Sequence, residues 1–178
     1  KVVYLGVYDT FADGDTRSNA SVQMFNRVDV WVQTIQKEST AYAKEKKAHD
    51  IICEYVEYEE GTYDQTAYSA VMQKKTVCAG YAKLYSMLTN AAGLETVSVT
   101  SATHGWNRTK LGNQWYNVDL TWDDGTPISY QFFNKSDATM EKYDGSSRES
   151  HTQNHYYDGV APGCESDYGA SVTGVGGE

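Results

Sequence analysis

The apolar residues near the start of the chain change from a short extended pattern to a helical one. Residues 1–15 hold a short apolar run that ends at Asp13-Gly14-Asp15, which predicts an extended segment followed by a turn. From Ser21 the apolar residues return to one face every three or four positions, and Ser18 or Asn19 precedes them as a candidate N-cap. The sequence therefore predicts a first helix that begins near residue 18.

A second helical pattern runs from about Ala41 to Val56. Its apolar residues form one stripe with the spacing of a buried helix face, namely Ala48, Ile51, Ile52 and Tyr55. We expect the charged run at residues 44–47 (Lys-Glu-Lys-Lys) to face solvent. Residues 64–73 are predicted to form a short helix or an irregular turn.

The clearest helical pattern runs from Cys78 to Ala92. Gly93 follows it at the position that left-handed helix caps prefer. After Gly93 the apolar period changes to two, which predicts three consecutive strands at residues 96–102, 104–111 and 114–120. Residues 121–127 are predicted to be a loop, and residues 129–133 a last strand.

The turn between the second and third of these strands sets which residues face each other. Gly112-Asn113 is typical of a tight hairpin turn, so facing residues have numbers that add up to about 225. His104 and Asp119 nearly meet that condition. Cross-strand neighbours of this kind have Cβ atoms roughly 4.5–8 Å apart, so we expect a hydrogen bond between the imidazole and the carboxylate.

Charge and composition exclude several classes of protein. The chain has 178 residues, with 15 Lys and Arg against 24 Asp and Glu, giving a net charge of −9. Nucleic-acid binding rests on cations that displace counterions from phosphates, so this balance argues against a nucleic-acid partner. No apolar run approaches the roughly 18 residues of a membrane-spanning segment. The 40% apolar content is typical of a globular chain.

Three cysteines are too few for a disulfide scaffold, and their odd number leaves at least one thiol free. Cys78 opens a helix, where unpaired N–H groups and the helix dipole stabilise a thiolate. A nucleophilic thiolate needs a base, and the base needs an orienting partner; His104 and Asp119 follow in that order. A lone helix-start cysteine is often only a small buried apolar residue, but the ordered set favours catalysis. Cys53 and Cys164 are expected to be bystanders.

Three motifs resemble those of the transglutaminase-like superfamily. Thr76-Val77-Cys78-Ala79-Gly80-Tyr81-Ala82 resembles its nucleophile segment, and His104-Gly105-Trp106-Asn107 its histidine strand. Residues 115–124, which include the Asp-x-Thr-Trp element, resemble the aspartate strand of this superfamily. The resemblance covers roughly residues 46–140, and it implies an α+β, papain-like fold with the nucleophile helix packed on an antiparallel sheet.

The resemblance also implies roles for single residues. Cys78 matches the nucleophile, His104 the general base and acid, and Asp119 the orienting carboxylate. Gln73 lies shortly upstream of the nucleophile, where papain-like enzymes keep an amide for the oxyanion hole. It is our candidate for that role, beside the alternative of a plain surface glutamine. Trp106 and Trp122 are candidate cleft walls, although strand tryptophans are more often core. No cofactor and no metal are implied.

Other polar residues receive structural interpretations. His151 and His155 lie four residues apart, but they lack a third ligand at the spacing of a metal site. His49-Asp50 is interpreted as a helix position with a local hydrogen bond. Aspartates at 13, 15, 123 and 124 show no calcium-loop pattern and are expected in solvated loops.

We expect residues 1–168 to form a single domain, with a helical part at about 18–75 and a catalytic core at about 76–140. Residues 169–178 are rich in Gly, Ser and Val and are predicted to be a flexible tail, or a linker to a further domain. The chain begins at Lys1 without Met, so we expect that a targeting segment has been removed. The polar, tyrosine-rich composition suggests a secreted or cell-surface protein, and the resemblance suggests bacteria.

The sequence thus predicts a cysteine-dependent acyl-transfer enzyme that acts on amide bonds of peptides or proteins through a thioester. Whether it is a peptidase, a deamidase or a protein-glutamine transglutaminase stays open. The alternative is a non-catalytic cell-surface binding module with the same fold. A cell-wall peptidase of papain-like fold shares the order of Cys and His but fits the Asp-x-Thr-Trp element poorly.

Overall fold

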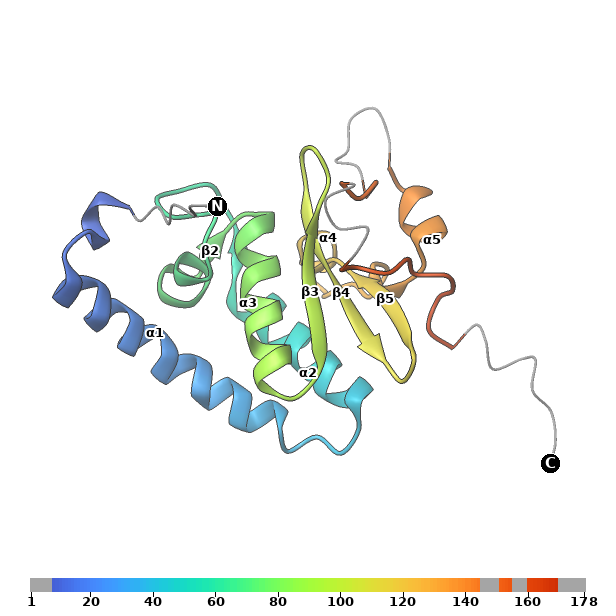
Figure 1. The fold of residues 1–178 in the computed structure, drawn as a ribbon, viewed down its shortest axis with the longest axis horizontal. Coiled ribbons are helices and arrows are strands. Elements are labelled where there is room, and N and C mark those ends of the chain that lie inside the picture. The colour runs from blue at the N-terminus through green and yellow to red at the C-terminus, as the bar shows by residue number, and fades with distance from the viewer. Residues whose placement is uncertain (1–7, 145–150, 155–159, 170–178) are drawn as a thin grey trace.

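The computed structural model describes residues 8–144, 151–154 and 160–169. A layer of helices occupies one side of the molecule and an antiparallel sheet the other, with helix α3 (Cys78–Ala91) between them (Figure 1). The predicted α+β class, with the nucleophile helix packed on an antiparallel sheet, is confirmed. Within the described ranges, no helix has the length and apolar character needed to cross a membrane.

The first long helix begins earlier than predicted. A short 3-10 turn, η1 (Asp9–Phe11), leads into α1 (Gly14–Ile35). Asp13 is the N-cap, because its Oδ2 accepts a hydrogen bond of 2.7 Å from the Thr16 amide. The triplet that the sequence interpretation assigned to a turn is therefore the cap and first turn of α1. The predicted extended segment at residues 1–7 lies outside the described residues.

Helix α2 (Ala41–Tyr55) confirms the second predicted helix, and Thr40 caps it. One expectation for it was wrong: Glu45 is fully buried. Its position, one turn before Ala48, belongs to the buried stripe although its charge suggested the opposite. Tyr85 and Asn134 compensate the burial, with hydrogen bonds of 3.2 and 2.7 Å to the carboxylate. Burial raises the pKa of Glu45 to about 7.

The segment between α2 and α3 is short and irregular. Strands β1 (Glu57–Tyr58) and β2 (Lys75–Thr76) pair in parallel, and a π-helical turn, η2 (Ser69–Gln73), lies between them. Gly80 permits the close approach of this segment to the first turn of α3. A Cβ atom at Gly80 would lie 1.7 Å from Thr76 Oγ1, so a side chain there has no room.

The main sheet has the order β3-β4-β5-β6, and every neighbouring pair is antiparallel. Its strands are β3 (Glu95–Thr100), β4 (Gly105–Leu111), β5 (Gln114–Val118) and β6 (Phe133–Lys135). Leu111 faces Gln114 and Asn107 faces Val118, which is the predicted hairpin register. Gly93 has the predicted left-handed conformation, with φ of 92°.

The chain after β5 differs from the prediction. Residues 121–127 were predicted to be a loop, but a short helix, α4 (Leu120–Asp123), opens this stretch, and α5 (Asp137–Glu141) follows the sheet. The last strand starts at Phe133, not at Ser129. The reason is that Asp123 holds the preceding turn: its carbonyl accepts from the Ser129 amide, and its carboxylate accepts from the Phe132 amide.

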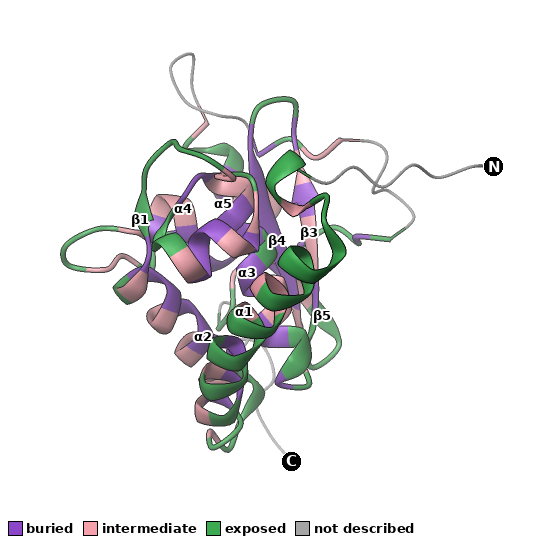
Figure 2. Ribbon diagram, turned by 90° about the vertical axis from the view of Figure 1, so that its left-hand side faces the viewer, coloured by how far each residue is buried: buried purple, intermediate pink, exposed green. Residues whose placement is uncertain are grey.

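Helix α3 is the centre of the core. It packs against α1 and α2 on one face and against β3 and β4 on the other. Leu84, Tyr85 and Leu88 are fully buried, and Figure 2 shows the purple of buried residues concentrated where the layers meet. Each such side chain stabilises the fold by about 1.5–3 kcal/mol relative to an exposed one. The sheet and the helical layer thus fix the position of the first residue of α3.

Candidate active site

Cys78 is the first residue of α3 and is half-buried, whereas Cys53 and Cys164 are buried. All three thiols are free. Burial raises the pKa of Cys53, and it raises the pKa of Cys164 to about 12, so neither forms a thiolate readily. Val77 precedes α3 in an extended conformation and provides no side-chain cap. The unpaired amides of the first helical turn are therefore next to the Cys78 thiol.

His104 lies in the turn that joins β3 to β4. Ser101 fixes this turn, because its Oγ accepts a hydrogen bond of 3.1 Å from the His104 amide and its own amide donates to the His104 carbonyl at 2.9 Å. The imidazole is buried. A buried, doubly anchored turn holds the ring in one orientation, as a general base requires.

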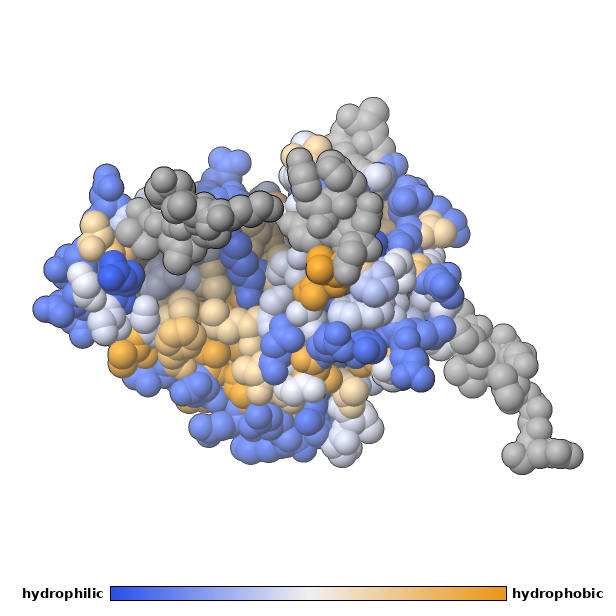
Figure 3. All heavy atoms as spheres, in the orientation of Figure 1, coloured by the Kyte–Doolittle hydropathy of each residue, from blue (hydrophilic) through white to orange (hydrophobic). Residues whose placement is uncertain are grey.

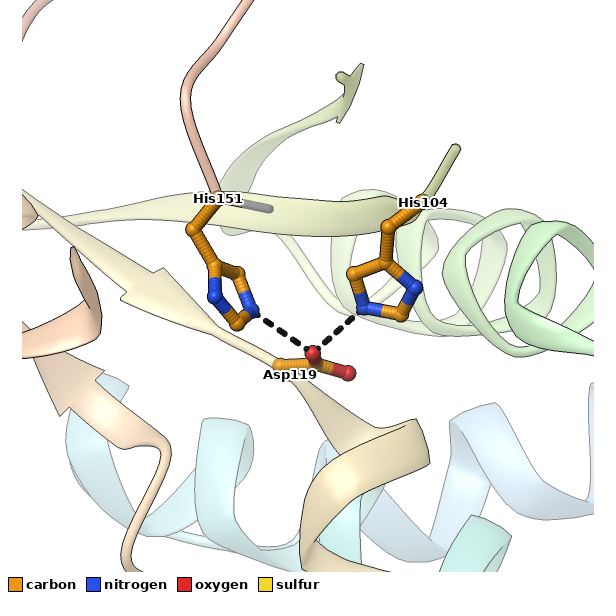
Figure 4. A group of neighbouring side chains, drawn as sticks. All are labelled: His104, Asp119 and His151. Atoms are coloured by element: carbon orange, nitrogen blue, oxygen red, sulfur yellow. Dashed lines mark hydrogen bonds and ion pairs between the residues drawn. The ribbon is translucent and has the colours of Figure 1, made fainter. Parts of the chain in front are cut away.

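Asp119 follows β5 and is the N-cap of α4. Its Oδ1 accepts hydrogen bonds from the amides of Thr121 (2.9 Å) and Trp122 (3.3 Å). Its Oδ2 lies 2.6 Å from His104 Nε2. The helix cap thus turns the carboxylate toward the histidine, and the predicted contact between the two side chains is present. Figure 4 shows the two side chains pointing toward each other from the adjacent ends of β4 and β5.

The electrostatics of this pair favour an imidazolium beside a carboxylate. Burial alone would lower the pKa of His104, but hydrogen bonds and charges from Asp119 and Cys78 raise it to about 10. Burial would raise the pKa of Asp119, but its bonds to His104 and His151 hold it at about 2. Because Nε2 of His104 faces Asp119, Nδ1 lies on the opposite side of the ring.

His151 is the residue that the sequence interpretation missed. Its Nε2 lies 3.0 Å from Asp119 Oδ2, so one carboxylate oxygen lies between two imidazoles (Figure 4). Asp144 Oδ1 lies 2.7 Å from His151 Nδ1 on the other side of the ring. The sequence interpretation paired His151 with His155, which lies outside the described residues. No periodicity marked residue 151 in the sequence.

The remaining predicted site residues are Trp122, Trp106 and Gln73, and they surround the His104–Asp119 pair less closely or not at all. Trp122 is half-buried, with its ring centroid 5.8 Å from that of His104. Trp106 is only 1% exposed, stacks behind His104 at 6.1 Å and donates to Asn117 Oδ1, so it is a core residue and not a cleft wall. Gln73 is exposed at the end of η2, and its role in an oxyanion hole stays a prediction.

Among the described residues, one group has the spacing of a metal site. It comprises His104, Asp119 and His151, whose ligand atoms lie within 4.8 Å of one another. Imidazole nitrogens and a carboxylate oxygen suit zinc. The same atoms already form direct hydrogen bonds of 2.6 and 3.0 Å, so a cation would have to displace both bonds.

A second group of Cys, His and Asp lies inside the helical layer. His49 Nε2 is 3.2 Å from Asp123 Oδ2 and 3.9 Å from Cys53 Sγ. The predicted local bond from His49 to Asp50 is also present, at 3.4 Å. His49 and Asp123 are fully buried, which corrects the expectation of a solvated loop at residue 123. Cys53 is only 7% exposed and His49 and Asp123 are fully buried, so we interpret the group as structural.

Comparison with known proteins identifies the family. A sequence model described as the transglutaminase-like superfamily matches residues 29–120, just over half of the chain, and this range includes all three predicted catalytic residues. No curated protein matches the chain. A solved structure of a TGase is 15% identical and has a TM-score of 0.49; the alignment covers 65% of this chain and 35% of the other.

A second solved structure, named a "Putative Cysteine Protease from Cytophaga hutchinsonii", is 20% identical and has a TM-score of 0.47. That alignment covers 65% of this chain and 45% of the other. The chain therefore spans less than half the length of each of these two proteins. The family rests on the sequence model: the chain belongs to the transglutaminase-like superfamily.

Proposed function

We propose that this protein is a cysteine-dependent enzyme that transfers acyl groups from amide bonds of peptides or proteins through a thioester. The observation that carries the proposal is a half-buried thiol at a helix start, together with His104, whose imidazole a buried carboxylate holds at 2.6 Å. Membership of the superfamily supports a cysteine-dependent enzyme in general. Within that general class, the proposed mechanism assigns a separate role to Cys78, His104 and Asp119.

In the proposed first half-reaction, the Cys78 thiolate attacks the carbonyl carbon of the amide. The Nδ1 proton of His104 passes to the leaving nitrogen as the C–N bond breaks, and a thioester remains on the sulfur. Asp119 keeps the ring oriented and stabilises its charged form. The amide of Cys78 is the natural donor for the oxyanion, with Gln73 as the predicted second donor.

In the second half-reaction, His104 takes a proton from water or from a second amine, which attacks the thioester carbonyl. The C–S bond breaks, and the thiolate leaves and is restored. Water gives hydrolysis, and an amine gives a cross-link. Both share the first half-reaction, so the site geometry supports both equally.

The test compares three products formed from glutamine-bearing peptides. Ammonia release without amine incorporation identifies a deamidase, incorporation of a labelled primary amine identifies a transglutaminase, and backbone cleavage identifies a peptidase. Cys78→Ala is the control and is expected to lose each product. Substrates that remain unchanged, together with binding that survives Cys78→Ala, would favour the non-catalytic binding module. A secreted or cell-surface location stays a proposal from composition.

A further inference from the structure

The surroundings of His151 differ from those of an ordinary buried histidine. Both ring nitrogens face carboxylate oxygens, with Nδ1 at 2.7 Å from Asp144 Oδ1 and Nε2 at 3.0 Å from Asp119 Oδ2. The backbone amide of His151 also donates to Asp144 Oδ2 at 2.8 Å. Ionised carboxylates only accept hydrogen bonds, so both ring nitrogens act as donors. This geometry suits the doubly protonated, positively charged form of the His151 ring.

Aromatic rings enclose this charge. The ring centroid of His151 lies 4.4 Å from that of Trp122, 5.1 Å from that of Trp106 and 6.3 Å from that of Phe132. The His151 side chain is only 1% exposed. Aromatic faces attract cations, and the exclusion of water strengthens the bonds to both aspartates. The tryptophans that the sequence marked as cleft walls therefore form part of a box around His151.

His151 also contributes to the orientation of the Asp119 carboxylate. Its Oδ2 is shared by His104 and His151, whose ring centroids are 5.4 Å apart, and its Oδ1 is occupied by two backbone amides. The carboxylate therefore has one orientation. A positive charge at this distance from His104 also opposes the protonation of His104. The charge of His151 therefore offsets part of the stabilisation that Asp119 gives to the protonated form of His104.

We propose that His151, held by Asp144, is a positioning residue of the active site, which orients Asp119 and tunes the release of the proton from His104. This inference rests on the proposed function. His151 acts through Asp119 and His104, not on the substrate itself. The chain of contacts runs from Asp144 through His151 and Asp119 to His104, whose pKa Cys78 also raises.

Other charged groups lie near His151 and belong to the same electrostatic environment. Arg108, Asp137 and Glu141 line a surface hollow with it. Arg108 donates to Asp137 at 2.7 Å, so these two charges largely offset each other. The groups in direct contact with the His151 ring nitrogens remain Asp119 and Asp144.

The experiment measures the pH dependence of Cys78 alkylation by iodoacetamide, and of turnover, in the full chain carrying His151→Gln. A glutamine amide can still donate to Asp119 but carries no charge. We expect both limbs of the pH profile to move upward by about one pH unit, because a nearby cation has been removed. Turnover at neutral pH should fall about tenfold with KM unchanged, since His104 then releases its proton less readily.

Asn154→Ala is the matched control. Asn154 anchors the same segment through bonds to Thr100 and Ser101, and it carries no charge. This variant should lower the melting temperature and leave the pH profile in place. If His151→Gln also lowers only the melting temperature, the role is structural and the proposal is overturned.

A measurement on the wild-type protein keeps the proposal testable if His151→Gln fails to fold. In NMR spectra, both ring N–H protons of His151 are expected to be hydrogen-bonded at neutral pH, and a ring with a single proton would overturn the proposal. A wild-type Cys78 that reacts as an ordinary thiol, independent of His104, would overturn the proposed function and the positioning role together. An unshifted profile in His151→Gln, with a His104-dependent wild type, would overturn the positioning role alone.

Discussion

The molecule contains two groups of cysteine, histidine and aspartate, and only one of them has the features of an active site. Cys53, His49 and Asp123 lie within 3.2–3.9 Å contacts inside the helical layer. Cys78, His104 and Asp119 lie where α3 meets the sheet. The residue types are the same in both groups, so composition does not explain the difference.

The two groups differ in access and in the position of the thiol along its helix. Cys53 lies near the end of α2, beyond the first turn and its unpaired amides, and burial raises its pKa. Cys78 opens α3 and is half-buried. A nucleophile needs an accessible thiolate, so the helix start matters more than the neighbouring imidazole. The comparison teaches that a Cys–His–Asp contact identifies a candidate only together with exposure.

The sharpest test of the comparison exchanges the two thiols for alanine. Cys78→Ala is expected to reduce turnover by at least about 10³-fold with little change in stability, because the nucleophile is lost. Cys53→Ala is expected to keep turnover and to lower the free energy of unfolding by about 1 kcal/mol, because it leaves a small cavity. Turnover by both variants at the wild-type rate would contradict the account.

The aspartates give the second comparison. Asp119→Asn is expected to lower kcat by roughly 10²–10⁴-fold, because an amide supports the histidine tautomer and charge poorly. Asp123→Asn should leave kcat near the wild-type value and lower stability by about 1–3 kcal/mol, because a buried hydrogen-bond set is disturbed. The measurements are steady-state kinetics and chemical denaturation of both variants. A large loss of kcat in Asp123→Asn, with kcat unchanged in Asp119→Asn, would assign catalysis to the group in the helical layer.

The pH dependence of stability gives a third, smaller effect. The pKa of His104 is raised in the folded state from 6.5 to about 10, so its contribution is complete below pH 6.5 and is lost as the pH rises toward 10. The pKa of Asp119 is lowered from 3.8 to about 2, so its contribution is complete above pH 3.8 and is lost as the pH falls toward 2. Both pKa shifts arise from the same His104–Asp119 ion pair, so their contributions to the free energy of unfolding cannot be added together.

We therefore expect the free energy of unfolding to fall by at most a few kcal/mol between pH 6.5 and 10, and His104→Gln to flatten this decline. His49 serves as the matched comparison, because its pKa is also raised, through bonds to Asp123 and Asp50 that outweigh its burial. His49→Gln should flatten part of the same decline without reducing turnover. A wild-type stability that stays constant across this range would contradict both assignments.

Local patterns predicted part of the geometry of the candidate site, wherever a turn or a helix start fixed it. The Gly112-Asn113 turn gave the register of the hairpin, and with it the contact between His104 and Asp119. Cys78 at a helix start followed from the change of period at residues 78–93 alone. These features depend on short-range backbone preferences, which a single sequence carries.

Long-range contacts were beyond the sequence. The burial of the Glu45 carboxylate is compensated by Asn134, which is far along the chain and donates to it. His151 approaches Asp119 from a segment with no apolar period, across 32 residues. Figure 3 shows an apolar region on the surface of the helical layer. Val22, Phe25 and Val30 of α1 are exposed although they are apolar. Neither the contact from Asn134 to Glu45 nor that from His151 to Asp119 leaves a local signal in the sequence.

The rate of Cys78 alkylation by iodoacetamide as a function of pH, in the wild type and in His104→Ala, tests the central claim most directly. Cys53→Ala and Cys164→Ala in the background make Cys78 the sole thiol. The account predicts rapid alkylation at neutral pH in the wild type, and in His104→Ala a profile that rises only near pH 8.5, as for an ordinary thiol. Identical profiles for the two proteins would contradict it.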